Sequence, residues 1–370
     1  MKVVVVSGIW PPDVGGPASH APEVADFLHE RGHRVEVVTT AWAPPEQRAY
    51  RVSAVPRSLR PGVRHLRGVA LIHHRARDAD VVYTTGMFGR SFAGATAARK
   101  PYVVKLTADP AFERARRRGI VGGDVDAFQA RTGPRVALLR LARDLELRRA
   151  AHVFCPSGYL RELVISWGIP AARVSVLPNP APRVGDLPSR DELRDRFGMT
   201  GDTLAFAGRL GAQKSLEVAF AAVDSVDDVS LVIAGDGEER ARLESVAGPR
   251  VRFLGPQPRE RILELFRAAD ASLLSSSWEN FPHTVVESLA VGTPVLATRV
   301  GGVAEVVRDG ENGLLVESGD ARALADAIRR YFADDALRAR LRAKAAESVR
   351  DYDRDTVFAR IEQALADAIA

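Results

Sequence analysis

Cysteine is almost absent from this sequence of 370 residues, which contains only Cys155. One thiol excludes an internal disulfide and a metal site built from several cysteines, and it fits a reducing compartment. Long apolar runs are missing too, since none reaches the roughly 18 residues that a membrane-spanning helix needs. The opening MKVVVVSGIWPP is too short an apolar run for a signal peptide and leads into two prolines. We interpret it as a first strand and expect a cytoplasmic protein.

Lysine is scarce, and the first half of the chain has few acidic residues to balance its arginines. Five of the 52 basic residues are lysines. Residues 1–180 contain 27 Lys and Arg against 15 Asp and Glu, whereas residues 181–370 contain 25 against 32. Two interpretations of the basic half stay open: arginine-rich helices that face solvent, or a surface that binds anionic lipid or a phosphorylated acceptor.

The basic excess is densest in ERARRRG (113–119). Six further arginines follow this stretch: Arg131, Arg135, Arg140, Arg143, Arg148 and Arg149. Proteins that bind single-stranded nucleic acid combine basic grooves with stacking aromatic residues, and aromatic residues do not alternate with these arginines. Nucleic acid is therefore not expected as a partner.

What the chain does contain is a repeated alternation of short apolar runs and helical stretches. In the first half the runs cover 2–7, 35–40, 80–85, 102–107 and 152–156, with a last one near 178; in the second half they are TLAFAGR, SLVIAGDG, VRFLGP, ASLLSSS, PVLATR and GLLVES. Such alternation predicts parallel sheets with helices on both faces. The length and a proline-rich segment near 180 predict two domains. We expect an α/β protein with two Rossmann-like domains, 1–182 and 183–350, that face each other across a cleft.

Glycines follow two of the predicted strands. Gly15 and Gly16 precede the first helix, where backbone N–H groups approach a phosphate or a sugar, although an ordinary turn explains them as well. Gly235 lies in the tight turn of IAGDG. The spacing is not GxGxxG, so the fingerprint of a dinucleotide-binding site is absent.

Two cations follow the first strand of the second half, in AGRLGAQKS. Arg209 and Lys214 suit a ligand that carries a diphosphate, with two solvated cations as the alternative. Two unit charges ~4 Å apart interact by about 4 kcal/mol at an effective dielectric of ~20. That energy is large enough to stabilise a departing diphosphate without a metal.

Two acids flank the junction SSSWENFPHTVVESLAVGTPV (275–295). Glu279 ends a strand and Glu287 lies in the next helix, for which Asn280 is the expected N-cap and Pro282 a first-turn residue. The helical rise predicts about 10 Å between the carboxylates. A retaining glycosidase needs its two acids ~5 Å apart, so a nucleophile and acid pair is excluded. We predict instead that the acids accept hydrogen bonds from hydroxyls at the two ends of an extended nucleotide sugar.

Taken together, these segments resemble the retaining glycosyltransferases of family 4, which have the GT-B fold. The resemblance covers nearly the whole chain and is most specific in GRLGAQKS, IAGDG, FLGP, SWENFPHTVVESLAVGTPVLAT and VGGVAEVVRDGENGLLV. It implies transfer of a hexose, with retention, from a UDP- or GDP-linked sugar to an acceptor hydroxyl. It implies no metal and no cofactor, a proton taken up by the leaving diphosphate, and a final helix (351–370) that packs back on the first domain.

The resemblance also implies roles for individual residues. Arg209 and Lys214 would bind the leaving diphosphate, Glu287 the ribose hydroxyls and Glu279 the donor sugar. A backbone amide of Gly16, with Gly15, would lie near the diphosphate or the acceptor. The further candidates for donor binding are Gly235, Asn280 and Phe281.

Three departures from the family pattern affect these expectations. Asn280 and Pro282 stand where relatives often have glycines, and the missing N–H of Pro282 leaves the donor sugar open. Where many relatives have a histidine near the reacting carbon, this chain has Asp109, which is a catalytic candidate or a helix cap. The DxD sequence at Asp124 and Asp126 occurs in the wrong fold for a metal site, so no metal is expected.

Other functions stay open at this point. An epimerase or a phosphorylase of the same architecture, or a non-catalytic nucleotide-binding protein, would share the fold. For the transferase, the acceptor is a small molecule, a glycan or a lipid-linked group. Peripheral contact with the inner face of an anionic membrane fits the basic first half.

Overall fold

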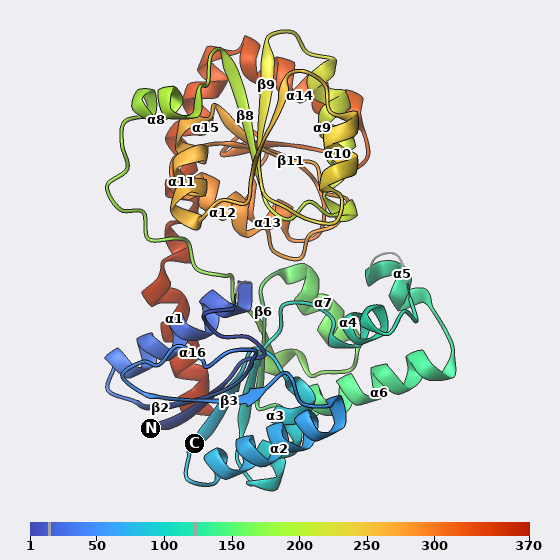
Figure 1. Cartoon of the computed structure of the whole chain (residues 1–370), viewed down its shortest axis with the longest axis vertical. Helices are drawn as coiled ribbons and strands as arrows, with labels where there is room; N and C mark the ends of the chain where they lie inside the picture. Colours follow the sequence, from blue (N-terminus) through green and yellow to red (C-terminus); the bar gives the residue numbers. More distant parts are fainter. Residues whose placement is uncertain (14–15, 122–124) are drawn as a thin grey trace. The chain divides into compact units, whose positions relative to one another are not determined.

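The computed structural model describes residues 1–13, 16–121 and 125–370 of the chain (Figure 1). Two compact units make up the fold: Met1–Pro178 together with Asp355–Ala370, and Asn179–Arg354. Each unit is a parallel sheet with helices on both faces (Figure 1). Among the described helices, none combines the length and apolar character that crossing a bilayer requires.

The first unit contains a seven-stranded sheet in the order β3-β2-β1-β4-β5-β6-β7. Its strands are β1 (Lys2–Val6), β2 (Arg34–Ala41), β3 (Arg51–Pro56), β4 (Val81–Thr84), β5 (Tyr102–Lys105), β6 (His152–Cys155) and β7 (Val174–Val176). The sequence pattern predicts six of these strands and misses β3. This edge strand pairs only with β2 and buries only Val52 and Val55, so it lacks the continuous apolar run of a central strand.

The helices of the first unit cover the two faces of this sheet. They are α1 (Gly16–Glu30), α2 (Pro61–Arg77), α3 (Phe88–Ala97), α4 (Pro110–Arg117), α5 (Val125–Ala130), α6 (Pro134–Arg149), α7 (Gly158–Ser166), the 3-10 turn η1 (Ala171–Arg173) and α16 (Arg354–Asp367). Val3 and Val5 of β1 join one apolar core, and Val4 and Val6 join the other. Successive side chains of a strand point to opposite faces, so the run VVVV serves both cores.

The C-terminal helix α16 completes the first unit, as the family resemblance implies. The ring of Phe358 meets the ring of Phe27 in α1 edge to face, with 5.7 Å between centroids. Glu362 pairs with His33 at 2.7 Å and with Arg31 at 3.1 Å. The last residues of the chain therefore belong to the same core as the first strand.

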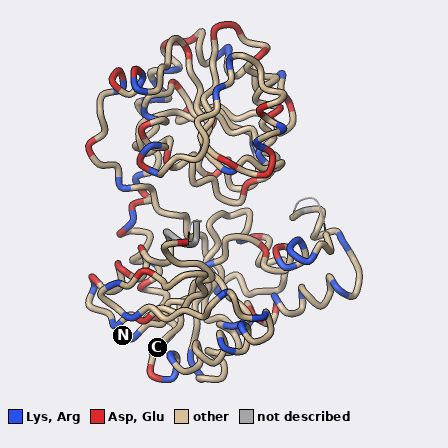
Figure 2. The backbone as a smooth tube through the Cα atoms, viewed as in Figure 1, with Lys and Arg blue, Asp and Glu red and all other residues tan. Residues whose placement is uncertain are grey.

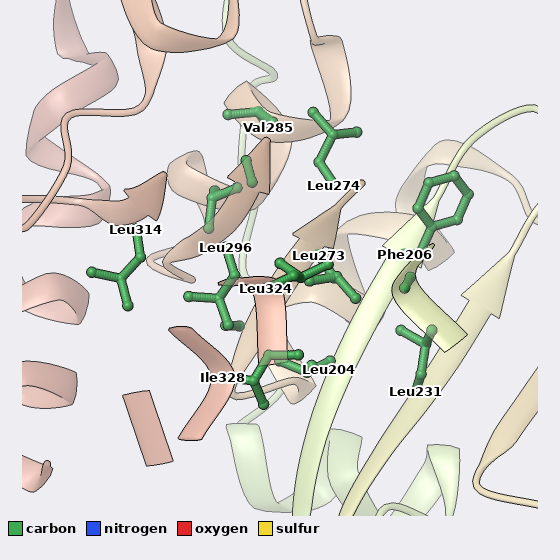
Figure 3. Packing of buried hydrophobic residues seen from close by; sticks show 14 of the residues in the cluster. Leu204, Phe206, Leu231, Leu273, Leu274, Val285, Leu296, Leu314, Leu324 and Ile328 are labelled. Atoms are coloured by element: carbon green, nitrogen blue, oxygen red, sulfur yellow. The ribbon is translucent and has the colours of Figure 1, made fainter. Parts of the chain in front are cut away.

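The second unit contains a six-stranded parallel sheet in the order β10-β9-β8-β11-β12-β13. Its strands are β8 (Asp202–Ala207), β9 (Val229–Ala234), β10 (Val251–Gly255), β11 (Ala271–Leu274), β12 (Val295–Thr298) and β13 (Gly313–Val316). Its helices are α8 (Arg190–Phe197), α9 (Leu216–Asp224), α10 (Arg240–Val246), α11 (Arg259–Ala268), α12 (His283–Ala290), α13 (Val303–Val306), α14 (Ala321–Ala333) and α15 (Asp335–Ala345), with 3-10 turns η2 (Ala212–Lys214) and η3 (Glu347–Tyr352). Figure 3 shows its interior, where leucines of β8, β11 and β12 meet Leu324 and Ile328 of α14. All six strands agree with the sequence prediction.

Each sheet reverses its strand order once. The reversal lies between β1 and β4 in the first unit and between β8 and β11 in the second. In open parallel sheets, ligands bind outside the carboxyl ends of the strands at such a switch point. In the second unit, a ligand is therefore expected at the loops that follow β8 and β11.

Candidate functional site

A lysine and a glutamate meet at the switch point of the second sheet. Lys214 ends the turn η2 after β8, and Glu279 follows β11, the neighbouring strand. Lys214 Nζ lies 2.5 Å from Glu279 Oε1, and the side chains are 13% and 9% exposed. The hydroxyl of Ser276 donates to the same carboxylate oxygen at 2.8 Å. This nearly buried ion pair is the centre of the candidate site.

The backbone around this pair is fixed by two neighbouring segments. The hydroxyl of Ser275 donates to the Lys214 carbonyl at 2.9 Å, which ties the end of β11 to η2. On the other side, the N–H of Gly302 donates to the Glu279 carbonyl at 3.2 Å. A Cβ on Gly301 would lie 1.7 Å from that carbonyl oxygen, and the φ of Gly301 is +45°. Only glycine fits at position 301. The turn at Gly301 and Gly302 therefore packs on the Glu279 carbonyl and fixes the position of the Glu279 backbone.

The second acid, Glu287, is the fifth residue of α12 and is nearly buried. Arg259 Nε, from α11, donates to its Oε1 at 3.0 Å, and the Glu287 side chain is 11% exposed. Burial raises the pKa of Glu287, and the Arg259 guanidinium opposes that rise. Since Oε1 of Glu287 accepts from Arg259, Oε2 of the same carboxylate is the oxygen for a ligand hydroxyl.

The helix that carries Glu287 begins later than predicted. Its N-cap residue is Pro282, with φ −84° and ψ 92°, and α12 starts at His283. The expectation that Asn280 caps the helix is wrong, because it would require helical backbone at Phe281. A residue that precedes proline disfavours that conformation.

Two other predicted donor residues, Phe281 and Asn280, are buried. Phe281 belongs to the apolar core of the second unit, with its ring centroid 6.2 Å from that of Tyr352 in η3. This packing leaves the backbone of Phe281, rather than its side chain, for a ligand. Sequence spacing carries no signal for His283, whose Nε2 lies 2.9 Å from Nδ2 of Asn179.

Arg209 lies in the same turn as Lys214 but has a partner of its own. Its Nε donates to Glu238 Oε2 at 3.0 Å, and the two side chains are 70% and 48% exposed. Exposed ion pairs of this kind contribute little free energy, so Arg209 exchanges its partner at low cost. Glu238 follows the predicted glycine turn at Gly235. Its pairing with Arg209 joins two separate turns, and sequence spacing does not reveal such a contact.

Gly235 is required by the close approach of two turns. A Cβ on Gly235 would lie 1.8 Å from the carbonyl oxygen of Gly208, and its φ is +152°. The turn after β9 therefore packs directly on the turn that leads to Arg209. Gly235 shapes this edge of the sheet through its backbone.

In the first unit, Asp109 is a helix cap rather than a free acid. It is the N-cap of α4 and accepts from the N–H of Ala111 at 2.8 Å. Its other oxygen accepts from Gln129 at 2.9 Å and from Arg143 at 3.0 Å. The Asp109 side chain is 0% exposed. Both oxygens serve the fold, which is the helix-cap alternative, and the catalytic role of Asp109 stays a prediction.

Two predicted segments, the glycine pair at the first helix and the DxD sequence before α5, are only partly described in the structure. Gly16 is the first residue of α1. Gly15 lies outside the described residues, as does Asp124 of the DxD sequence, and Asp126 is described only as part of the α5 backbone. These roles stay predictions.

The first unit also carries a group of basic side chains, which we call the α2–α4 basic cluster: Arg64 and His65 of α2, Arg90 of α3, and Arg114 of α4, which pairs with Glu146 at 2.6 Å. Burial lowers the pKa of His65, and the charges of Arg90 and Arg114 lower it further. Burial and then the charge of Arg64 lower the pKa of Arg90. Arg90 Nη1 donates to the sulfur of Met87 at 2.9 Å, and no carboxylate among the described residues pairs with it. A half-buried, crowded cation of this kind is a ready partner for an anion.

Comparison with known proteins identifies the family. Residues 15–180 match the model of a glycosyl transferase 4-like domain, and residues 189–348 match the model of glycosyl transferases group 1. The chain is 30% identical over 384 residues to the D-inositol 3-phosphate glycosyltransferase of Xylanimonas cellulosilytica, an alignment that covers 94% of this chain and 90% of that protein. The chain belongs to the group 1 glycosyltransferases.

Two further similarities support this assignment. The chain is 29% identical to the phosphatidyl-myo-inositol mannosyltransferase of Mycobacterium leprae, over 94% of this chain and 91% of that protein. Among solved structures, Anabaena Alr3699/HepE in complex with UDP superposes with a TM-score of 0.81 at 21% identity, over 99% of this chain and 100% of that one. The predicted GT-B fold and family are confirmed. The chain is a glycosyltransferase of a retaining hexosyltransferase family, so the epimerase, phosphorylase and non-catalytic alternatives are set aside.

Proposed function

We propose that this enzyme transfers a hexose from a UDP- or GDP-linked sugar to a hydroxyl of an acceptor that carries a phosphate. The observation that carries the proposal is the pair of Lys214 and Glu279 at the switch point of the second sheet. A lysine Nζ has three donor hydrogens. Lys214 therefore holds Glu279 with one hydrogen and has two left for the oxygens of a diphosphate.

The remaining donor contacts follow from the same geometry. Arg209 turns from Glu238 to the diphosphate, and Glu279 accepts from hydroxyls of the transferred sugar. Glu287 accepts from the ribose hydroxyls through Oε2 while Arg259 keeps Oε1. Within the second unit, the backbones of Gly235 and Asn280 line the donor site.

The transfer itself needs charge stabilisation rather than a metal. The bond between the anomeric carbon and the diphosphate oxygen breaks, and the acceptor oxygen bonds to the same carbon on the face that the diphosphate leaves. The proton of the acceptor hydroxyl passes to the departing diphosphate. Lys214 and Arg209 stabilise the charge that develops there. An opposite charge ~4 Å away contributes about 4 kcal/mol at an effective dielectric of ~20, and the exposed Arg209 contributes less than Lys214. The configuration of the sugar is retained.

An anionic acceptor is supported by the α2–α4 basic cluster, in which Arg90 pairs with no carboxylate among the described residues. Its helices leave the carboxyl ends of β3, β4 and β5, the edge at which such sheets bind ligands. One relative is named for inositol 3-phosphate and another for phosphatidyl-myo-inositol, and both names describe anionic acceptors. We assign acceptor binding to the first unit, donor binding to the second unit and closure of the first unit to α16. A lipid-linked acceptor would bring the basic first unit to the anionic inner face of a membrane.

The donor assignment is tested by thermal shift with UDP, GDP, ADP and TDP. A nucleotide at 100 times its dissociation constant stabilises the protein by about 2.7 kcal/mol. We expect UDP or GDP to raise the melting temperature and Lys214→Ala to abolish the rise. A shift with none of the four nucleotides, or a full shift in the variant, contradicts the donor site.

The acceptor assignment is tested with Arg90→Gln. A charge-assisted hydrogen bond contributes about 1.5–3 kcal/mol, so KM for a phosphorylated acceptor should rise at least tenfold. Hydrolysis of the donor sugar in the absence of acceptor should stay unchanged. Arg67→Gln, at an exposed position of α2, is the matched control. An equal KM for Arg90→Gln and the wild type contradicts the anionic acceptor.

A further inference from the structure

Helix α6 exposes a row of leucines on its outer side. Leu138, Leu141 and Leu145 are 66%, 55% and 51% exposed, although large apolar residues are mostly buried elsewhere in the described chain. They follow one another at spacings of three and four residues, so they lie on one side of the helix. The row spans about 10 Å at 1.5 Å per residue.

The opposite side of α6 already supplies what the first unit needs. Its buried residues are Val136, Leu139, Arg143, Glu146 and Leu147. The exposed leucines therefore add nothing to the core. A solvent-facing helix would carry polar residues at these positions.

The fully exposed residues of this outer face carry positive charge and no negative charge, and the partly exposed Asp144 beside them pairs with Arg143 at 2.8 Å. The exposed residues of α6 are Pro134, Arg135, Ala137, Leu138, Leu141, Leu145, Arg148 and Arg149. Three further exposed arginines, Arg116, Arg117 and Arg118, lie at the end of the adjacent α4. Figure 2 shows basic residues along both helices.

Two other arginines of α6 are committed to the fold, which separates them from this surface. Arg140 donates to the carbonyls of Phe128 and Gln129 at 2.6 and 2.9 Å. Arg143 pairs with Asp109 and stacks on Trp167, with its guanidinium carbon 3.7 Å from the ring centroid. The basic run predicted from the sequence thus divides into structural arginines and exposed ones.

We infer that this outer face of α6 is a membrane-binding surface, which inserts its leucines below the headgroups of an anionic bilayer while the arginines bind lipid phosphates. A leucine row bordered by arginines matches the chemistry of such an interface. A second copy of this chain is disfavoured, because two such faces would bring arginines against arginines. The inference deepens the proposed membrane contact and rests on it.

Insertion is tested with an environment-sensitive label. Cys155 is fully buried, so a nitrobenzoxadiazole label attached to Leu141→Cys reports this position alone. Vesicles with 30% phosphatidylglycerol should shift its emission to the blue and raise its intensity several-fold at low salt. Vesicles of phosphatidylcholine should leave the emission unchanged. The same label at Val246→Cys, an exposed apolar position of α10 in the second unit, is the matched control.

Binding itself is measured by vesicle flotation. The triple variant Leu138→Gln, Leu141→Gln and Leu145→Gln should bind at least tenfold more weakly than the wild type, with the same melting temperature and the same donor hydrolysis. Wild-type protein that does not float with anionic vesicles contradicts the membrane contact itself. Wild type and triple variant that bind alike contradict the role of α6 alone. A triple variant that only converts a dimer to a monomer in sedimentation velocity assigns the face to a second copy and overturns the inference.

Discussion

Single charged residues of the second unit are held in place by opposite charges. Lys214 pairs with Glu279, and Arg209 with Glu238. The positions of Lys214, Arg209 and Glu279 after β8 and β11 were predictable from the apolar runs, and their contacts with a nucleotide sugar stay a prediction. Glu238 was not predictable, because its role comes from a contact between two turns that only the packing of Gly235 on Gly208 brings together.

Replacement of Lys214 should separate catalysis from stability. Removal of one preorganised group that stabilises developing charge typically lowers turnover 100- to 1,000-fold, about 3–4 kcal/mol. We expect Lys214→Ala to lose at least 100-fold in kcat. Its melting temperature should fall by only a few degrees, because Ser276 still donates to Glu279. Steady-state kinetics and thermal melts measure both effects.

The double variant Lys214→Ala with Glu279→Gln is the control for this prediction. It removes the unpaired buried charge, so its melting temperature should recover. Its turnover should stay low. If turnover recovers together with stability, Lys214 acts only as a structural partner.

Replacement of Glu238 should strengthen donor binding, whereas replacement of Lys214 should weaken it. Glu238→Gln releases Arg209 from an exposed ion pair, and such pairs contribute about 0.2–1 kcal/mol. We therefore expect a dissociation constant for UDP or GDP that is up to about fivefold lower, measured by calorimetry. Glu244→Gln removes a comparable exposed pair, with Arg240, and is the control. Weaker nucleotide binding by Glu238→Gln contradicts the competition for Arg209.

At the scale of elements, the ends of helices were harder to predict than their existence. The strand-to-helix order of the second unit follows from apolar runs, but α12 starts at His283 because of the proline before it. Asp109 shows the same limit. Its sequence position suits a cap and a catalytic acid equally, and only the contacts with Gln129 and Arg143 favour the cap.

Replacement of Asp109, the cap of helix α4, should therefore lower the free energy of unfolding. Asp109→Ala removes an N-cap and leaves the buried Arg143 without this partner, a loss of about 3–5 kcal/mol in the free energy of unfolding. Asp109→Asn keeps the cap and should lose less. Urea unfolding measures both variants. An Asp109→Ala protein of unchanged stability and abolished turnover would support the catalytic role instead.

At the scale of the whole molecule, two parallel sheets were predictable and their strand orders were not. Continuous apolar runs between helices indicate parallel strands, because both faces must be covered. The pairing of β1 with β4 and of β8 with β11 depends on which helix covers which face. Those two pairings create the switch points, and hence the site.

One residue links the first sheet to the segment that leaves it. Lys105, at the end of β5, is fully buried and donates to the carbonyls of Leu177 and Pro178, the last residues before the second unit begins. Burial is the main cause that lowers the pKa of Lys105 to about 7. The buried charge is therefore unfavourable in the folded protein, and its protonation depends on pH.

The sign of this dependence follows from the two pKa values. Below pH 7 Lys105 is charged in both states, so the folded protein bears the full penalty. Between about 7 and the usual lysine value near 10.4 the unfolded chain binds the extra proton, so stability rises with pH. We expect the melting temperature of the wild type to rise from pH 6.5 to 9 relative to Lys105→Met, which has lost the titrating group. The lost hydrogen bonds to the two carbonyls shift the variant equally at every pH. If the difference in melting temperature between the two proteins is constant from pH 6.5 to 9, Lys105 keeps its charge in the folded protein and the prediction is wrong.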